Sequence, residues 1–168
     1  MSSPSPEQRL AELGLTLPPA AKPLASYVPA LRSGNHVYTS GQLPTVDGEL
    51  VEVGKVETGA DAPVSPEAAK AAARVCVLNA LAAVRAVLGD LSRVVRVVKV
   101  VGYVASMPNF TGQPGVVNGA SDLLADVFGG SHDGQPGVGS HARSAVGVAV
   151  LPLDAPVEVE LVVEVAPD

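Results

Sequence analysis

The C-terminal stretch VEVELVVEV, residues 157–165, places the strongest constraint on the fold of this 168-residue chain. Side chains of a β-strand point alternately to its two faces, so this stretch has one apolar face and one acidic face. The apolar face carries Val157, Val159, Leu161, Val163 and Val165, and the other face carries Glu158, Glu160 and Glu164. Such a strand belongs to a sheet that is buried on one side only, which favours an α+β domain with helices on that side.

Two other segments have the signals of helices that can cover this sheet. Residues 65–89 begin with a Ser-Pro pair that suits a helix start, and they end at a glycine. Small apolar residues recur at helical spacing along them, and Cys76 on this stripe is expected to be a buried apolar residue rather than a nucleophile. Residues 114–130 have a second helical pattern that ends in a glycine pair.

The remaining segments predict strands and turns. We expect a strand within residues 36–44, a hairpin turn at Asp47–Gly48, and a β-branched strand within residues 93–107. A strand that starts at Arg143 is followed by the turn PLDAP, so we expect it to pair with residues 157–165 as a hairpin.

Together these elements predict one α+β domain over residues 1–168, with a mixed sheet and two helices packed on one face. Residues 1–22 are expected to form an N-terminal helix and a linker that extend this domain. Residues 129–140 are expected to form a glycine-rich loop.

Composition narrows the classes of function. The formal charge is −6 and only 3% of residues are aromatic, so a nucleic-acid partner is not favoured. No apolar segment approaches the length of about 18 uncharged residues that a membrane span needs, so no membrane partner is expected. The N-terminus lacks the apolar core of a signal peptide, which leaves the cytoplasm as the expected location. His36, His132 and His141 lack the spacing of a metal site, so no metal is expected.

Arg143 is the residue whose surroundings most suggest chemistry. In the stretch SHARSAVGVAVLP, residues 140–152, it shares a strand face with Ala145, Gly147 and Ala149. These small residues leave space beside the guanidinium, whose planar fork suits a carboxylate. The same pattern fits an arginine exposed at a strand start, or one that pairs with a glutamate of the protein itself.

Glu158 is the glutamate that could act with Arg143. In a direct hairpin centred near Asp154, seven strand residues would separate the two, or about 23 Å at 3.3 Å per residue. One hairpin therefore cannot bring them together. A shared site would need two chains, or a bulge that bends the hairpin sharply.

The motifs VYTSGQLP (37–44), VVNGASDLL (116–124) and ARSAVGVAVLPLDAPVEVE (142–160) resemble the YjgF/RidA family of reactive-intermediate deaminases. The resemblance implies a chorismate-mutase-like fold, assembled as a homotrimer with three sites in the clefts between subunits. It also implies hydrolysis of 2-imino acids, or their enamine tautomers, to 2-keto acids and ammonia, without metal or organic cofactor.

The resemblance assigns roles to individual residues. Arg143 matches the arginine that grips the substrate carboxylate, and Glu158 matches the glutamate that positions or activates water. Tyr27 matches a tyrosine that lines the cleft, and Gly41 and Asn118 match further positions in the cleft.

The chain also departs from the family pattern. Ala145 stands where many members have cysteine, and ASYVPA stands in place of the usual glycine-proline-tyrosine segment. The N-terminal extension and the glycine-rich loop indicate a divergent branch.

Two alternative functions stay open at this point. One is a trimer that binds small carboxylates for regulation, without catalysis. The other is an endoribonuclease, which the acidic charge and the scarcity of aromatic residues disfavour.

Overall fold

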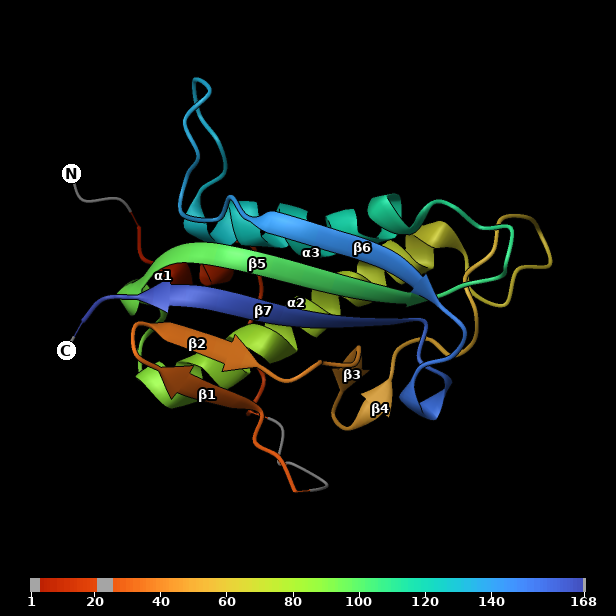
Figure 1. The fold of residues 1–168 in the computed structure, drawn as a ribbon, viewed down its shortest axis with the longest axis horizontal. Coiled ribbons are helices and arrows are strands. Elements are labelled where there is room, and N and C mark those ends of the chain that lie inside the picture. The colour runs from red at the N-terminus through yellow and green to blue at the C-terminus, as the bar shows by residue number, and fades with distance from the viewer. Residues whose placement is uncertain (1–3, 21–25, 168) are drawn as a thin grey trace.

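A five-stranded mixed sheet forms one layer of the protein, and helices cover one of its faces (Figure 1). The structure is a computed structural model that describes residues 4–20 and 26–167. The strand order is β1-β2-β7-β5-β6. These strands span Ala30–Ser33 (β1), His36–Thr39 (β2), Val157–Val165 (β7), Val94–Ala105 (β5) and Ala142–Val148 (β6).

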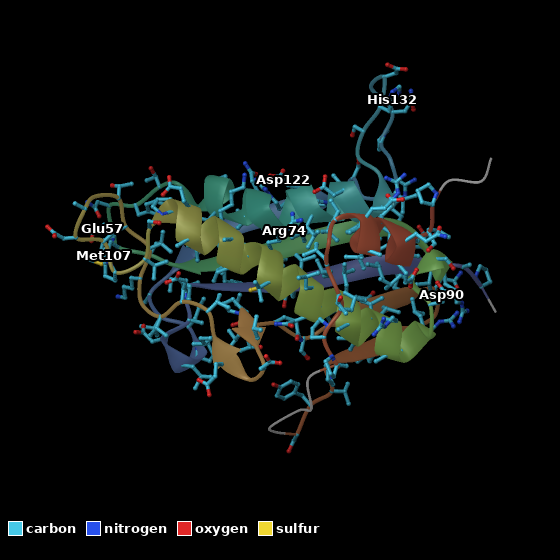
Figure 2. The ribbon with its side chains drawn as sticks, turned by 180° about the vertical axis from the view of Figure 1, so that it is seen from behind. Glu57, Arg74, Asp90, Met107, Asp122 and His132 are labelled. Carbon is cyan, nitrogen blue, oxygen red and sulfur yellow. The ribbon has the colours of Figure 1, made fainter. Side chains whose placement is uncertain are left out.

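The helices are α1 (Pro6–Glu12), α2 (Pro66–Leu88) and α3 (Gln113–Phe128), with short 3₁₀ turns at Leu91–Arg93 and Pro152–Asp154. Helices α2 and α3 lie side by side over the sheet, as Figure 2 shows from behind. Every second residue of β7 from Val157 to Val165 is apolar and buried beneath them, while its glutamates and Val162 are partly exposed on the other face. The expected fold class is therefore confirmed.

Helix α2 is the central element of the core. The Ser65 hydroxyl caps it by accepting a hydrogen bond from the amide of Ala68, and Gly89 ends it. Cys76 is fully buried on its sheet-facing side, and this burial raises the pKa of the thiol well above its usual range. The helix has the length and mean hydropathy of a membrane span, but 61% of that window is buried inside the domain, so packing accounts for its apolar character.

Helices α2 and α3 approach closely at Gly119. A Cβ at this position would overlap the backbone carbonyl of Lys70, so only glycine fits there. Two ion pairs cross the same seam, Lys70–Asp122 at 3.1 Å and Arg74–Asp126 at 3.7 Å. Figure 2 shows Arg74 and Asp122 on this surface.

The predicted hairpin between the last two strands is wrong. Strand β5 lies between them, with β6 parallel to it and β7 antiparallel to it. The chain passes from β6 to β7 through the turn Pro152–Asp154, where Leu153 and Asp154 have φ of 58° and 60°. This turn carries the chain past the end of β5 instead of folding it straight back.

The predicted turn at Asp47–Gly48 is confirmed. It joins β3 (Thr45–Val46) to β4 (Glu49–Leu50), and both of its residues have positive φ, as a tight hairpin of this kind requires. A further hairpin, β1–β2, precedes it and was not predicted.

The glycine-rich loop between α3 and β6 stands away from the rest of the chain, with His132 at its tip (Figures 1 and 2). Its tip is a two-residue turn in which His132 and Gln135 exchange backbone hydrogen bonds of 2.9 and 3.0 Å. At its base the amide of Gly139 donates to the carbonyl of Gly129 at 2.8 Å. A Cβ at Gly139 would overlap the carbonyl of Leu124, so glycine lets the loop close against the end of α3.

Candidate active site

Arg143 lies on the edge strand β6, with its side chain against α3. Its Nη1 donates to Asn118 Oδ1 at 2.7 Å and to Ser121 Oγ at 3.1 Å. Its register partner in β5 is the buried Val100, which places Arg143 on the helix-covered side of the sheet. The structure thus brings together two predicted residues, Arg143 and Asn118.

The rest of the guanidinium has no partner among the described residues, since both hydrogen bonds of Arg143 come from Nη1. The Nε–H and one Nη2–H of an arginine point in parallel and form a side-on fork. This edge of Arg143 matches the two oxygens of a carboxylate.

His141 extends the same cluster. Its Nδ1 lies 2.7 Å from the carbonyl oxygen of Gly139, and its Nε2 lies 2.9 Å from Ser121 Oγ. A carbonyl oxygen can only accept, so Nδ1 carries the proton and Nε2 of the neutral ring accepts from the Ser121 hydroxyl. Burial lowers the pKa of His141, Arg143 lowers it further, and the bond to Gly139 acts in the opposite direction.

Glu158 lies on the opposite, open face of the sheet. A Cβ at Gly41 would overlap its carboxylate, so the absence of a side chain at residue 41 makes room for Glu158. Burial raises the pKa of Glu158, and Glu160 nearby raises it further. The Tyr103 hydroxyl donates to Glu160 at 3.1 Å on the same face. A half-buried carboxyl with a raised pKa is suited to exchange protons near neutral pH.

Tyr27 is half-exposed on the segment before β1. That segment is tied to the residue before Gly41, because the Ser40 hydroxyl donates to the carbonyl of Val28 at 2.7 Å. The Ser40 amide also donates to the carbonyl of Pro29 at 2.8 Å. The backbone thus brings the segment of Tyr27 to the end of β2 where Gly41 meets Glu158.

The predicted residues therefore form two groups that one chain does not bring together. Arg143 and Glu158 lie on opposite faces of the sheet with β5 between them, opposite Val100 and Tyr103 respectively. Three residues along β5 and two strand spacings across the sheet separate their Cα atoms by about 14 Å. This separation is shorter than the 23 Å expected from a direct hairpin. Because the two side chains lie on opposite faces of the sheet, a shared site still needs a second chain.

Sequence reasoning missed Ser121 and His141. Asn118 and Ser121 are three residues apart and therefore share a helix face, which is the signal that could have linked them. Within residues 4–20 and 26–167, no three His, Cys, Asp or Glu side chains gather as a metal site would require.

A mixed sheet with helices packed on one face defines a two-layer α+β protein. The family model described as "YjgF/chorismate mutase-like, putative endoribonuclease" matches residues 7–165. The chain belongs to this YjgF family. Because the match begins at residue 7, it includes helix α1.

Three similar proteins illustrate the relationship. Protein TCP17 of Trypanosoma cruzi is 47% identical over 156 residues, which cover 92% of this chain and 91% of that protein. The crystal structure of a protein of unknown function from Agrobacterium tumefaciens has 47% sequence identity and a TM-score of 0.83, and the match covers 96% of this chain and 92% of that chain. The crystal structure of a "putative endoribonuclease" from Shewanella oneidensis has 33% sequence identity and a TM-score of 0.86, and the match covers 96% of this chain and 100% of that chain.

Proposed function

We propose that this protein hydrolyses 2-imino acids, and their enamine tautomers, to 2-keto acids and ammonia in clefts formed between copies of the chain. The observation that carries this proposal is the Nε/Nη2 edge of Arg143, which makes no hydrogen bond to any residue that the structure describes, while two residues of α3 hold Nη1. A substrate with a carboxylate next to its reacting carbon fits this edge.

The reaction needs little from the protein. A protonated imine carbon is already electrophilic, so water adds to it to give a carbinolamine. The C–N bond then breaks as the C=O bond forms, and one protonated 2-imino acid and one water give one 2-keto acid and one ammonium ion. The protein must hold the carboxylate, place the water and transfer protons.

Glu158 supplies the proton transfers in this proposal. Its carboxylate accepts a proton from the attacking water and then donates it to the nitrogen that leaves. The raised pKa supports both steps, because the group then gains and loses a proton more readily near neutral pH.

A second chain is needed to complete the cleft. The open face of the sheet carries exposed apolar side chains, among them Leu31, Tyr38 and Val146, which no helix covers. Such a face favours contact with another copy, and we propose a homotrimer in which Glu158 of one chain approaches Arg143 of the next.

Imines generated in situ by an amino-acid oxidase provide the test, with ammonia release measured above the spontaneous rate. The wild-type protein is expected to accelerate hydrolysis, and Arg143→Ala and Glu158→Gln are expected to remove the acceleration. Glu164→Gln is the matched control, because Glu164 lies on the same face of β7 but outside the proposed site.

Two outcomes would point to other functions. No acceleration across several imines, together with binding of 2-keto acids that Glu158→Ala leaves intact, would favour a non-catalytic carboxylate-binding trimer. RNA cleavage that purifies with the protein and survives Arg143→Ala would favour the ribonuclease activity in the family description.

A further inference from the structure

A chain of hydrogen bonds runs from Arg143 through Ser121 to His141 and Gly139, which is more than a carboxylate clamp alone requires. We propose that Ser121 and His141 are positioning residues: Ser121, together with Asn118, occupies Nη1 of Arg143, and His141 orients the Ser121 hydroxyl. A substrate carboxylate is thereby directed to the side-on edge formed by Nε and Nη2. The inference rests on the proposed function, because it specifies how the clamp of that site is held.

The donors and acceptors of this cluster allow one consistent arrangement with neutral His141. The carbonyl oxygen of Gly139 can only accept, so His141 Nδ1 donates to it and Nε2 is left as an acceptor. The Ser121 hydroxyl therefore donates to Nε2 at 2.9 Å and keeps a lone pair for Arg143 Nη1 at 3.1 Å. Asn118 Oδ1 takes the other Nη1 proton at 2.7 Å.

His141 determines where the Ser121 proton goes. A serine inside a helix commonly donates to the carbonyl four residues earlier, which here is that of Val117. With His141 as the acceptor, the hydroxyl oxygen is instead drawn toward Arg143. Removal of His141 is thus expected to let the hydroxyl rotate and to free the Nη1 corner of the guanidinium.

The base of the glycine-rich loop holds the carbonyl group to which His141 donates. Gly139 closes against the carbonyls of Leu124 and Gly129, which fixes the position of its own carbonyl beneath His141. The base of the loop thereby sets the tautomer and the tilt of the ring.

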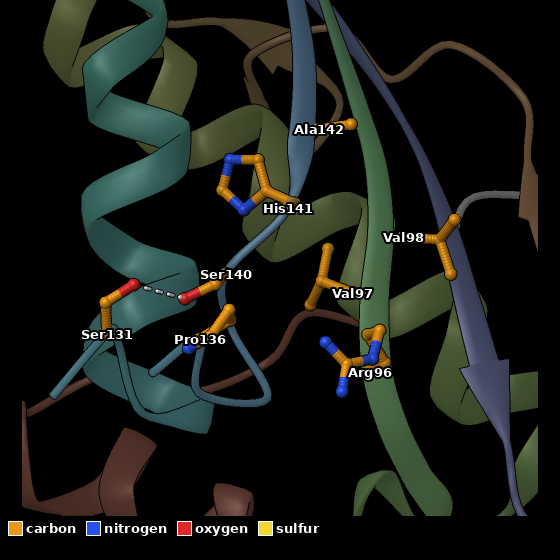
Figure 3. A pocket seen from close by; sticks show the side chains of 8 residues that line it. All are labelled: Arg96, Val97, Val98, Ser131, Pro136, Ser140, His141 and Ala142. Atoms are coloured by element: carbon orange, nitrogen blue, oxygen red, sulfur yellow. Dashed lines mark hydrogen bonds between the residues drawn. The ribbon is translucent and has the colours of Figure 1, made fainter. Parts of the chain in front are cut away.

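His141 also borders a hollow of about 300 Å³ beside the loop (Figure 3). Its ring is therefore close to solvent as well as to the clamp. The charged groups facing it are Arg143 on β6 and Arg96, which lines the hollow from β5, while α3 presents the neutral Ser121. A carboxylate bound to Arg143 offsets one of these positive charges, so we expect it to make protonation of His141 easier.

Side-chain NMR of the ¹⁵N-labelled full-length protein tests the inference without reference to turnover. In the free protein we expect slow rotation of the Arg143 guanidinium and a proton on Nδ1 of His141. On titration with pyruvate we expect the Nε–H resonance of Arg143 to move downfield and the pKa of His141 to rise.

Variants separate positioning from general stability. His141→Ala and Ser121→Ala are expected to speed rotation of the guanidinium and to weaken pyruvate binding about fivefold or more, while Ser121→Thr, which keeps the hydroxyl, restores both. His132→Ala is the matched control, because His132 lies at the exposed tip of the loop.

Each failure has a different meaning. If pyruvate binds but leaves the Nε–H resonance unmoved, or if His141→Ala behaves like His132→Ala, the positioning role is wrong and the proposed function stands. If neither pyruvate nor 2-oxobutyrate binds to a protein whose guanidinium is held rigidly, the carboxylate clamp and the inference built on it are both wrong.

Discussion

Gly41 lies directly against the Glu158 carboxylate, in a position where a Cβ would overlap it. The contact joins the segment after β2 to the open face of β7, next to the bridge between Gln42 and Val159. The position of the Glu158 carboxylate, the proposed proton-transfer group, therefore depends on the absence of a side chain at residue 41.

Replacing Gly41 by alanine should therefore displace the carboxylate. We expect Gly41→Ala to lower kcat for imine hydrolysis on the order of 10²-fold, because a displacement of about 1 Å is enough to misalign a reacting group. Binding of pyruvate should be retained, since Arg143 holds the carboxylate and is itself positioned by Asn118 and Ser121. Normal kcat in a folded Gly41→Ala protein would contradict the role given to Glu158.

The pH dependence of stability gives a second check on Glu158. Because the fold raises its pKa, the folded state holds this proton at a pH where the unfolded chain has released it. The wild-type protein should thus lose stability relative to Glu158→Gln as the pH rises through the raised pKa. Thermal unfolding at pH 4 and pH 7 is the measurement. A Gln variant that is less stable than wild type at pH 7, and equal to it at pH 4, would reverse the expected sign.

Arg143→Lys tests whether the fork, rather than positive charge alone, binds the substrate. An ammonium group cannot offer two parallel donors to a carboxylate while it is also held by Asn118 and Ser121. We expect KM to rise about thirtyfold, or about 2 kcal/mol, with a smaller change in kcat. Equal KM values for the two proteins in steady-state assays would show that charge alone is sufficient.

Two glycines of α3 provide a matched test of the helix packing. Gly119→Ala should destabilise the fold by about 1–3 kcal/mol, because the new Cβ meets the carbonyl of Lys70. Gly115→Ala should be neutral or stabilising by about 0.5–1 kcal/mol, because nothing lies within 4 Å of its Cβ position. Urea unfolding of both variants measures the difference, and equal stabilities would mean that the α2–α3 contact can shift without cost.

Several helices, strands and turns could be predicted from the sequence, because patterns of neighbouring residues specify them. The alternation in residues 157–165 defines a half-buried strand, and the caps at Ser65 and Gly89 bound the long helix where the structure has it. The Asp47–Gly48 turn likewise follows from two residues that accept positive φ.

The order of the strands could not be predicted in the same way. A short turn between two strands favours a hairpin, but the 12-residue strand β5 pairs with both of them instead. The left-handed conformation of Leu153 and Asp154 makes this possible, and Leu153 could not be predicted to adopt it, since such φ values usually fall on glycine, asparagine or aspartate.

The candidate site was predictable only in part, for a related reason. Four of the predicted site residues lie in two pairs, Arg143 beside Asn118 and Glu158 beside Gly41. Ser121 and His141 belong to the site through the close approach of α3 to β6 and through the base of a loop. The three-residue spacing of Asn118 and Ser121 puts both on one helix face. No sequence pattern indicates that this face, or His141, meets Arg143.

In the proposed trimer, Arg143 of one chain and Glu158 of its neighbour form one site. Co-refolding equal amounts of Arg143→Ala and Glu158→Ala tests this arrangement most directly, because a mixed trimer has one interface that combines an intact Arg143 with an intact Glu158. Random mixing in a cyclic trimer predicts about one quarter of wild-type imine hydrolysis, from two variants that are each inactive alone. Mixed trimers, verified by mass spectrometry, that stay inactive would contradict the claim.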